Sequence, residues 1–244
     1  MNLPERLHAI HRIWRYRLRS ERDEIRHLLS LDLSGTTIID VGAHRGAYTH
    51  WMSRKAGKEG RVIAFEPQPE LHAYLERMAG PFRWGNVTLG PFALSSHEGS
   101  AQLSRPRHWG AASLEPVPEE GPVEHFEVPL TSLDAYRARH PELPRVGFVK
   151  IDVQDHELPV LQGATGTLES CRPEILFECV DHIFRHGRIH QLLDSLGYSG
   201  FFFYRRELVP VEKLSDLREK IPAPYLNYVY RERASLSGRN LSHG

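Results

Sequence analysis

Short apolar runs rich in Val, Ile and Phe recur along the chain from residue 36 onward. We interpret five of them as strands: Thr37–Val41, Arg61–Glu66, Asn86–Leu94, Val146–Val153 and Glu174–Val180. Most of these runs are separated by stretches of helical character: Ala47–Ala56, Pro69–Ala79 and Leu158–Ser170. Nearly continuous apolar strands that alternate with helices predict a parallel sheet that is covered by helices on both faces.

The pattern changes after Val180. A helix over Ile189–Leu196 is expected to end at Gly197, and further strands are expected at Tyr198–Tyr204 and Tyr225–Tyr230. The proline-rich segment Gly99–Pro129 predicts a long insertion between strands, and such loops are usually functional or mobile. We therefore expect a helical extension at residues 1–33, an α/β domain at 34–234 and a disordered tail at 235–244.

The first 31 residues carry apolar side chains at roughly helical spacing among many arginines. These apolar residues are Leu7, Ile10, Ile13, Trp14, Leu18, Ile25, Leu28 and Leu29. They predict one or two helices that cap the domain. A basic helix on a membrane surface is the alternative, but four acidic residues between Glu5 and Glu24 dilute its charge. We favour the first interpretation, because amphipathic stripes mostly face the core.

The composition is that of an ordinary globular protein. Of the 244 residues, 40% are hydrophobic and 25% are charged. Lys plus Arg equals Asp plus Glu at 31 each, so the overall charge gives no case for nucleic acid as a partner. No apolar run could span a bilayer, no signal peptide is evident, and two cysteines make no disulfide framework. We expect a cytoplasmic protein without integral membrane association.

The stretch IIDVGAHRGAYTHW, from Ile38 to Trp51, runs from a buried strand through a turn into a helix. Gly42 permits a tight turn, and Gly46 permits close packing at the start of the helix. Ligands of open α/β sheets bind at such turns, beyond the carboxyl ends of the strands. The dinucleotide fingerprint G-x-G-x-x-G is incomplete, because His44 takes its middle position and no third glycine follows. A nicotinamide oxidoreductase is therefore disfavoured.

Two acidic residues at strand ends indicate a different nucleoside ligand. Glu66 closes the strand after Gly42, where a carboxylate accepts hydrogen bonds from the ribose hydroxyls of an adenosine-containing ligand. Asp40 adds negative charge close to the turn, which disfavours a phosphate and suits the ammonium group of an amino acid. Adenosine, no phosphate and an amino acid tail together describe S-adenosylmethionine.

The motifs resemble, in order and spacing, those of FkbM-type methyltransferases over about residues 36–205. The stretches that carry this resemblance are IIDVGAHRGAYTHWM, GRVIAFEPQPELHAYLERMAG, NVTLGPFALSSHEGSAQL, VPLTSLDAY, FVKIDVQDHELPVLQGATGTL and RPEILFECV. The resemblance implies a Rossmann-like α/β fold whose seven-stranded, mostly parallel sheet has the order 3-2-1-4-5-7-6 and an antiparallel last strand. It also implies methyl transfer from S-adenosylmethionine to a hydroxyl of a sugar, a glycoside or another natural product.

The same resemblance implies roles for individual residues. The first motif, which should surround the methionine end of the cofactor, is matched by Asp40, Gly42, Ala43, His44 and Gly46. The acid that binds the ribose is matched by Glu66, with Pro67 after it. The end of the third strand, near the adenine, is matched by Ala93, Leu94 and Ser95. The acid beside the donor methyl group is matched by Asp152.

The chain departs from the family pattern at two motifs. His44 replaces an asparagine in the first motif, which leaves a hydrogen-bonding side chain with altered geometry. In Ile151–Glu157 the family typically has I-D-V-E-G-x-E, whereas this chain has Gln154 in place of the acid and Asp155 in place of the glycine. An enzyme that used the missing acid as base or metal ligand would need a substitute here, and Asp155 and His156 are both candidates.

Methyl transfer to an alcohol benefits from a general base. Asp152, His156 and Glu178 lie near neighbouring strand ends and are the candidates. His156 has the only ordinary pKa near neutrality among them. Glu178 closes an otherwise apolar strand, where a buried carboxylate needs a partner or a function. Asp152 could instead serve as a helix cap or a cofactor ligand.

Two other clusters invite a functional interpretation. His182, His186 and His190 would share one helical face and could bind a metal with Asp181, but a solvated stripe is the simpler interpretation, and we expect no metal site. In the insertion, basic and aromatic side chains could hold an acceptor or could be solvated: Arg105, Arg107, His108 and Trp109. The sequence leaves open whether the protein forms a homo-oligomer. The alternative function is a catalytically impaired, cofactor-binding homologue that acts as a partner or regulatory subunit.

Overall fold

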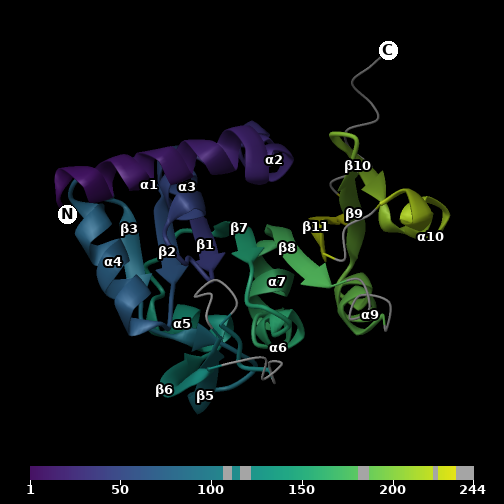
Figure 1. Cartoon of the computed structure of the whole chain (residues 1–244). Helices are drawn as coiled ribbons and strands as arrows, with labels where there is room; N and C mark the ends of the chain where they lie inside the picture. Colours follow the sequence, from purple (N-terminus) through teal and green to yellow (C-terminus); the bar gives the residue numbers. More distant parts are fainter. Residues whose placement is uncertain (107–111, 116–121, 181–186, 222–224, 235–244) are drawn as a thin grey trace.

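A computed structural model describes residues 1–106, 112–115, 122–180, 187–221 and 225–234 (Figure 1). Its centre is an eight-stranded sheet with the order β10-β9-β11-β8-β7-β1-β2-β3. The strands of this sheet are β1 (Thr37–Val41), β2 (Arg61–Phe65), β3 (Val87–Gly90), β7 (Val146–Ile151), β8 (Glu174–Val180), β9 (Tyr198–Tyr204), β10 (Glu207–Pro210) and β11 (Tyr225–Glu232).

Seven of the eight strands have the expected order. The strands from β3 to β8 pair in parallel, and β11 runs antiparallel to both β8 and β9. The expected number of seven is wrong, because β10 adds an antiparallel edge strand to β9. Arg205 and Arg206 form the intervening two-residue turn with φ of 51° and 73°. Such turns usually contain Asn or Gly, so two arginines give no hairpin signal in the sequence.

Each face of the sheet has its own apolar core, and helices cover both faces as expected. One face is covered by the N-terminal helices together with α3 (Ala47–Ala56) and α4 (Pro69–Ala79). The other is covered by α5 (Leu133–Arg139), α6 (Glu157–Gln162), α7 (Thr165–Cys171) and α9 (Arg188–Ser195). Strand alternation divides the side chains, so that Ile38 of β1 packs in the first core and Ile39 in the second.

Two elements expected as single units are divided. The expected helix over Leu158–Ser170 is split into α6 and α7 at Gly163, where a Cβ atom would stand 2.0 Å from the carbonyl oxygen of Ser95. The expected strand Asn86–Leu94 ends as β3 at Gly90 and resumes as β4 (Ala93–Leu94) in another sheet. Pro91 lies at this break, where its missing N–H cannot continue a ladder.

The insertion Gly99–Pro129 is partly strand. Its ends form β5 (Gly99–Arg105) and β6 (Glu124–Thr131), which pair antiparallel from Gly99–Leu130 to Arg105–Glu124. With β4 they make a three-stranded sheet of order β4-β6-β5. The polar, small residues of β5 gave no alternating apolar pattern.

The C-terminal part adds three short helices between β10 and β11: η3 (Val211–Lys213), α10 (Leu214–Leu217) and η4 (Arg218–Lys220).

The N-terminal segment is helical and lies along the sheet beside α3 (Figure 1). It consists of α1 (Leu3–Arg15), a π-helical turn η1 (Tyr16–Ser20) and α2 (Arg22–Ser30). Asn2 and Glu5 cap α1 reciprocally, which satisfies two backbone N–H groups at its start. The apolar residues Ile13, Ile25 and Leu28 are buried as expected. No helix in the described ranges is long and apolar enough to cross a bilayer.

One expectation about this segment is wrong. Leu7, Ile10, Trp14 and Leu18 do not face the core but are between 36% and 59% exposed. The buried side of α1 needs only the small residue Ala9 together with Ile13, because α3 packs closely against it. Most of the apolar stripe is therefore left to solvent.

The close approach of β1 to β7 yields a prediction about Gly42. A Cβ atom at Gly42 would stand 2.0 Å from the carbonyl oxygen of Asp152, and its φ is +78°. Gly35 has a similar φ of +73° but open space around it, so Gly35→Ala is a matched control. Both variants should lose about 1–2 kcal/mol to backbone strain. Gly42→Ala should lose about 1–3 kcal/mol more through overlap, measured by urea unfolding. Equal losses would contradict the inferred crowding.

Candidate active site

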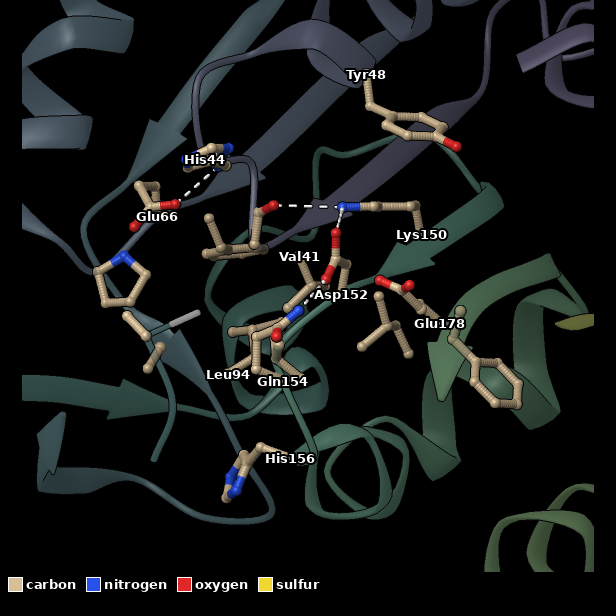
Figure 2. Close-up of a pocket in the computed structure, with 18 of the residues that line it drawn as sticks. Val41, His44, Tyr48, Glu66, Leu94, Lys150, Asp152, Gln154, His156 and Glu178 are labelled. Carbon is tan, nitrogen blue, oxygen red and sulfur yellow. Dashed lines mark hydrogen bonds and ion pairs between the residues drawn. The ribbon is translucent and has the colours of Figure 1, made fainter. Parts of the chain in front are cut away.

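A pocket lies at the carboxyl ends of the central strands (Figure 2). Three neighbouring strands contribute residues at or just beyond their ends, and β8 contributes two residues from within the strand: Val41, Gly42, Phe65, Glu66, Ile151 and Asp152, with Phe177 and Glu178 from β8. Four strands therefore bring together side chains that are far apart in the sequence. This is the edge at which open α/β sheets bind ligands.

The turn after β1 is fastened to the end of β2. The backbone N–H groups of Gly42 and Ala43 both donate to the carbonyl oxygen of Phe65 at 3.0 Å. The N–H of His44, at φ +50°, donates to Glu66 Oε2 at 2.8 Å. The His44 side chain lines the pocket, and burial, followed by the charge of Arg45, lowers its pKa to about 4. Its imidazole is therefore neutral at physiological pH.

Glu66 is held by the backbone in a fixed orientation. The carboxylate accepts the N–H of His44 on Oε2 and the N–H of Gln68 on Oε1 at 3.0 Å. It is 2% exposed, and burial raises its pKa to about 7 despite these two donors. Each oxygen has further lone pairs for a ligand hydroxyl. The geometry fits a carboxylate that binds two neighbouring hydroxyl groups.

The expected cofactor residues divide into a lining group and a supporting group. His44, Glu66, Pro67, Ala93 and Leu94 line the pocket together with Gly42 and Asp152. The other three are not among its lining residues: Asp40, Ala43 and Gly46. Asp40 is fully buried and accepts the hydroxyl of Thr49 at 2.6 Å. A Cβ atom at Gly46 would meet Trp84 at 2.6 Å, so this glycine allows the helix to pack, as its spacing indicated.

Lys150 was not among the expected site residues. Its ammonium nitrogen lies 3.2 Å from Asp152 Oδ2, 3.9 Å from Asp40 Oδ1 and 3.3 Å from the carbonyl oxygen of Gly42. Burial alone would lower its pKa, but Asp152 and Asp40 outweigh burial and raise it. Lys150 is therefore a cation that joins the ends of β1 and β7. The available signal was a lysine within the apolar run GFVKIDV.

Asp152 is an anion at the centre of the pocket. Its Oδ1 accepts the amide of Gln154 at 3.1 Å, and its Oδ2 faces Lys150. Burial would raise its pKa, but the charge and hydrogen bond of Lys150 and the amide of Gln154 lower it. The unusual Gln154 thus orients Asp152. Gln154 and Asp155 have φ of 53° and 77°, and the family's glycine at the second position suits this left-handed backbone.

Glu178 lines the pocket on the other side of Asp152 from Glu66 (Figure 2). Burial, followed by the negative charge of Asp152, raises the pKa of Glu178 to about 7. A carboxyl group that titrates near neutrality can exchange protons at working pH. The structure therefore supports Glu178 as a proton acceptor better than Asp152, whose pKa is lowered.

His156 lies in the wall of the pocket and not in solvent. Its Nδ1 lies 2.6 Å from Glu115 Oε1 and its Nε2 lies 3.0 Å from Ser95 Oγ. Both ring nitrogens are therefore engaged in hydrogen bonds within the protein. This arrangement indicates that His156 positions the loop beneath the pocket, and it leaves the imidazole less suited to accept a proton from a bound ligand.

The N-terminal segment and β11 also contribute to the pocket, which sequence reasoning missed. Tyr16, Glu21 and Asn227 are lining residues. Glu21 accepts the hydroxyl of Tyr48 at 3.3 Å and the amide of Asn227 at 3.4 Å. Burial, followed by the charge of Glu24, raises the pKa of Glu21 to about 8. No local pattern distinguishes Glu21 from the other acids of an arginine-rich helix.

Of the remaining candidates, Arg105 and His190 are described by the structure and do not line this pocket. Arg105 is bound by Glu70 and Glu124 and lies over the ring of Phe126, so it is not directed at an acceptor. His190 lies 2.9 Å from the hydroxyl of Tyr230. Within the described ranges, no three His, Cys, Asp or Glu side chains form a group that could hold a metal ion. Six candidates lie outside the described residues: Arg107, His108, Trp109, Asp181, His182 and His186.

Comparison with known proteins identifies a family for the chain. The methyltransferase FkbM domain family matches residues 40–199. The hexuronic acid methyltransferase AglP of Haloferax volcanii is 33% identical over 170 residues, which are 66% of this chain and 64% of AglP. Methyltransferase 1 of Beauveria bassiana is 24% identical over 179 residues, with 66% and 72% covered. The chain thus spans slightly less than two thirds of AglP.

Solved structures show the same fold. The methyltransferase FkbM of Methylobacillus flagellatus superposes with a TM-score of 0.54 at 14% identity, over 83% of this chain and 45% of that protein. A Streptococcus mutans structure in complex with SAH superposes with a TM-score of 0.52 at 10% identity, over 87% and 98%. The family match covers most of the chain, and the pocket lies where the family motifs meet. The chain belongs to the FkbM family of S-adenosylmethionine-dependent methyltransferases.

Proposed function

We propose that this protein transfers a methyl group from S-adenosylmethionine to a hydroxyl group of a sugar, a glycoside or another natural product. The observation that carries the proposal is a single pocket with the Glu66 carboxylate at one side and the Glu178 carboxyl at the other. A sugar acceptor is supported by the resemblance to AglP, a hexuronic acid methyltransferase.

The residues present fit the cofactor. Glu66 presents two backbone-held oxygens that suit the ribose hydroxyls. Beside it, Phe65, Pro67, Phe92 and Leu94 give the pocket apolar walls that suit an adenine ring. Asp152 keeps a negative charge in the pocket, which suits a cationic ligand. When bound, S-adenosylmethionine would supply an electrophilic methyl group.

The protein's own residues would then position the acceptor and take its proton. Glu178, Asn227, Tyr16 and Glu21 line the part of the pocket that we assign to the acceptor. Glu178, with its pKa near 7, would accept the hydroxyl proton on a carboxylate oxygen as the oxygen attacks. Asp152 would remain ionised, held by Lys150 and Gln154. Positioning of the two reactants supplies the rest of the acceleration.

A catalytically impaired homologue remains the second candidate. The observation that favours it is Gln154, which replaces the family's acid and is engaged with Asp152. Such a protein would bind S-adenosylhomocysteine and yet methylate nothing. Turnover with a panel of sugar, glycoside and polyketide acceptors separates the two functions, because cofactor binding is common to both.

Glu66→Ala should weaken the binding of S-adenosylhomocysteine by about 1–3 kcal/mol, because two hydrogen bonds to buried ribose hydroxyls are lost. Isothermal titration calorimetry measures this change. Glu59→Ala, an exposed glutamate on the turn after α3, is the matched control and should bind as the wild type does. Tight NAD binding without any S-adenosylhomocysteine binding would overturn the proposed function.

Glu178→Gln should lower kcat by about 10²–10⁴-fold and remove the acidic limb of the pH–rate profile. The sign follows from the base role: Glu178 is ionised above its pKa of about 7, so the wild-type rate should fall as pH drops through 7. Glu21→Gln is the control from the same pocket and should keep the limb. Retention of the limb in Glu178→Gln would assign the proton to another group.

Transfer should not depend on a divalent metal ion, because Gln154 supplies no carboxylate and the described acids form no ligand group. We expect full turnover in excess chelator, measured with the best acceptor from the panel. Complete loss of turnover that added magnesium or manganese restores would contradict this expectation.

A further inference from the structure

An apolar stripe on the N-terminal helix faces solvent. Its members are Leu3, Leu7, Ile10, Trp14 and Leu18, which are 69%, 57%, 36%, 47% and 59% exposed. They follow one another at intervals of three or four positions, which places them along one side of a helix. Within the described part of the chain, every large hydrophobic side chain of comparable exposure belongs to this stripe. Such concentration differs from the scattered apolar residues of an ordinary surface.

The opposite side of the helix is anchored, so the stripe cannot turn inward. Ala9 and Ile13 are buried against α3. The indole N–H of Trp51, in α3, donates to the carbonyl oxygen of Ile13 at 3.3 Å. Rotation of α1 would expose this buried side and break the hydrogen bond. The stripe is therefore a fixed feature of the folded surface.

Positive charge accompanies the stripe. Residues 3–20 contain five arginines and one acidic residue, Glu5, although Lys plus Arg equals Asp plus Glu over the whole chain. Glu5 accepts the backbone N–H of Asn2 at 3.0 Å in the helix cap. Arg6, Arg15 and Arg19 are exposed, and each directly precedes or follows a stripe residue. The apolar strip thus has a cationic border.

We propose that α1 and η1 lie in the interface of an anionic lipid membrane, with the stripe in the acyl boundary and the arginines at the headgroups. A helix with leucines and a tryptophan on one side and flanking arginines has the composition of a helix that lies in the membrane plane. A second copy of this chain fits less well, because two such faces would bring their arginines together without acids to balance them.

The docked orientation also involves the pocket, because the same helical segment supplies Tyr16 and Glu21 to its lining. A membrane under this segment would therefore lie close to that part of the pocket. The proposal goes beyond methyl transfer and does not depend on it. Binding to vesicles can be measured without any acceptor.

The experiment is cosedimentation of the full chain with phosphatidylcholine vesicles that contain or lack phosphatidylglycerol. The wild type should sediment with the anionic vesicles and much less with the neutral ones. Replacement of Arg6, Arg15 and Arg19 by Gln should weaken binding by roughly a hundredfold, since each arginine near an anionic surface contributes on the order of fivefold. A separate triple variant, Leu3→Gln, Leu7→Gln and Leu18→Gln, should also bind the anionic vesicles much more weakly than the wild type, because it loses three of the five apolar stripe residues.

The control variant carries Arg188→Gln, Arg205→Gln and Arg206→Gln, three exposed arginines elsewhere that give the same change of net charge. It should bind as the wild type does, and unaltered circular dichroism of all variants verifies the fold. Absence of sedimentation with anionic vesicles would overturn the proposal. An equal loss of vesicle binding in the control variant would also overturn the proposal, because binding would then depend on net charge and not on the position of the arginines. If the wild type binds no vesicles but is a dimer in light scattering, and the leucine variant is a monomer, the stripe would instead bind a second copy of the chain.

Discussion

The buried ammonium group of Lys150 holds the carboxyl edge of the sheet together. It lies within 3.9 Å of Asp40 and 3.2 Å of Asp152 and contacts the carbonyl oxygen of Gly42. Two acidic residues and a backbone dipole thus share one buried cation, with Asp40 behind it and the partly exposed Asp152 in the pocket. Removal of Lys150 would leave two carboxylates uncompensated, which is far costlier than loss of an exposed ion pair. The turn after β1 and the anionic state of Asp152 both depend on it.

This arrangement makes the pocket electrostatically uneven. Asp152, beside the lysine, has a lowered pKa, whereas burial raises the pKa of Glu66 and Glu178 to about 7 and that of Glu21 to about 8. A carboxyl group with a raised pKa stabilises the fold below its unfolded pKa, and this contribution is lost as pH rises through its folded pKa. Acidic residues with perturbed pKa values cluster at functional sites, so the three raised pKa values in one pocket support a functional site here.

The N-terminal segment combines three roles within about twenty residues. Its inner side packs on α3, its middle supplies Tyr16 and Glu21 to the pocket, and its outer side carries the exposed stripe. The π-helical turn η1 contains both Tyr16, which lines the pocket, and Leu18, which belongs to the stripe. We regard the segment as part of the site, although the family match begins only at residue 40.

The sequence alone determined the parallel strands, the turn at Gly42 and the acid at Glu66, because these depend on local apolar runs, glycines and strand ends, and its resemblance to a known family implied the order of seven strands. Only the tertiary structure decided which side chains meet. Lys150 sits between two acids from neighbouring strands, both ring nitrogens of His156 find partners, and Leu7 and Trp14 face solvent while Ala9 is buried. Pairing across strands and the depth of burial depend on contacts between distant segments, and a one-dimensional pattern carries no distance between them.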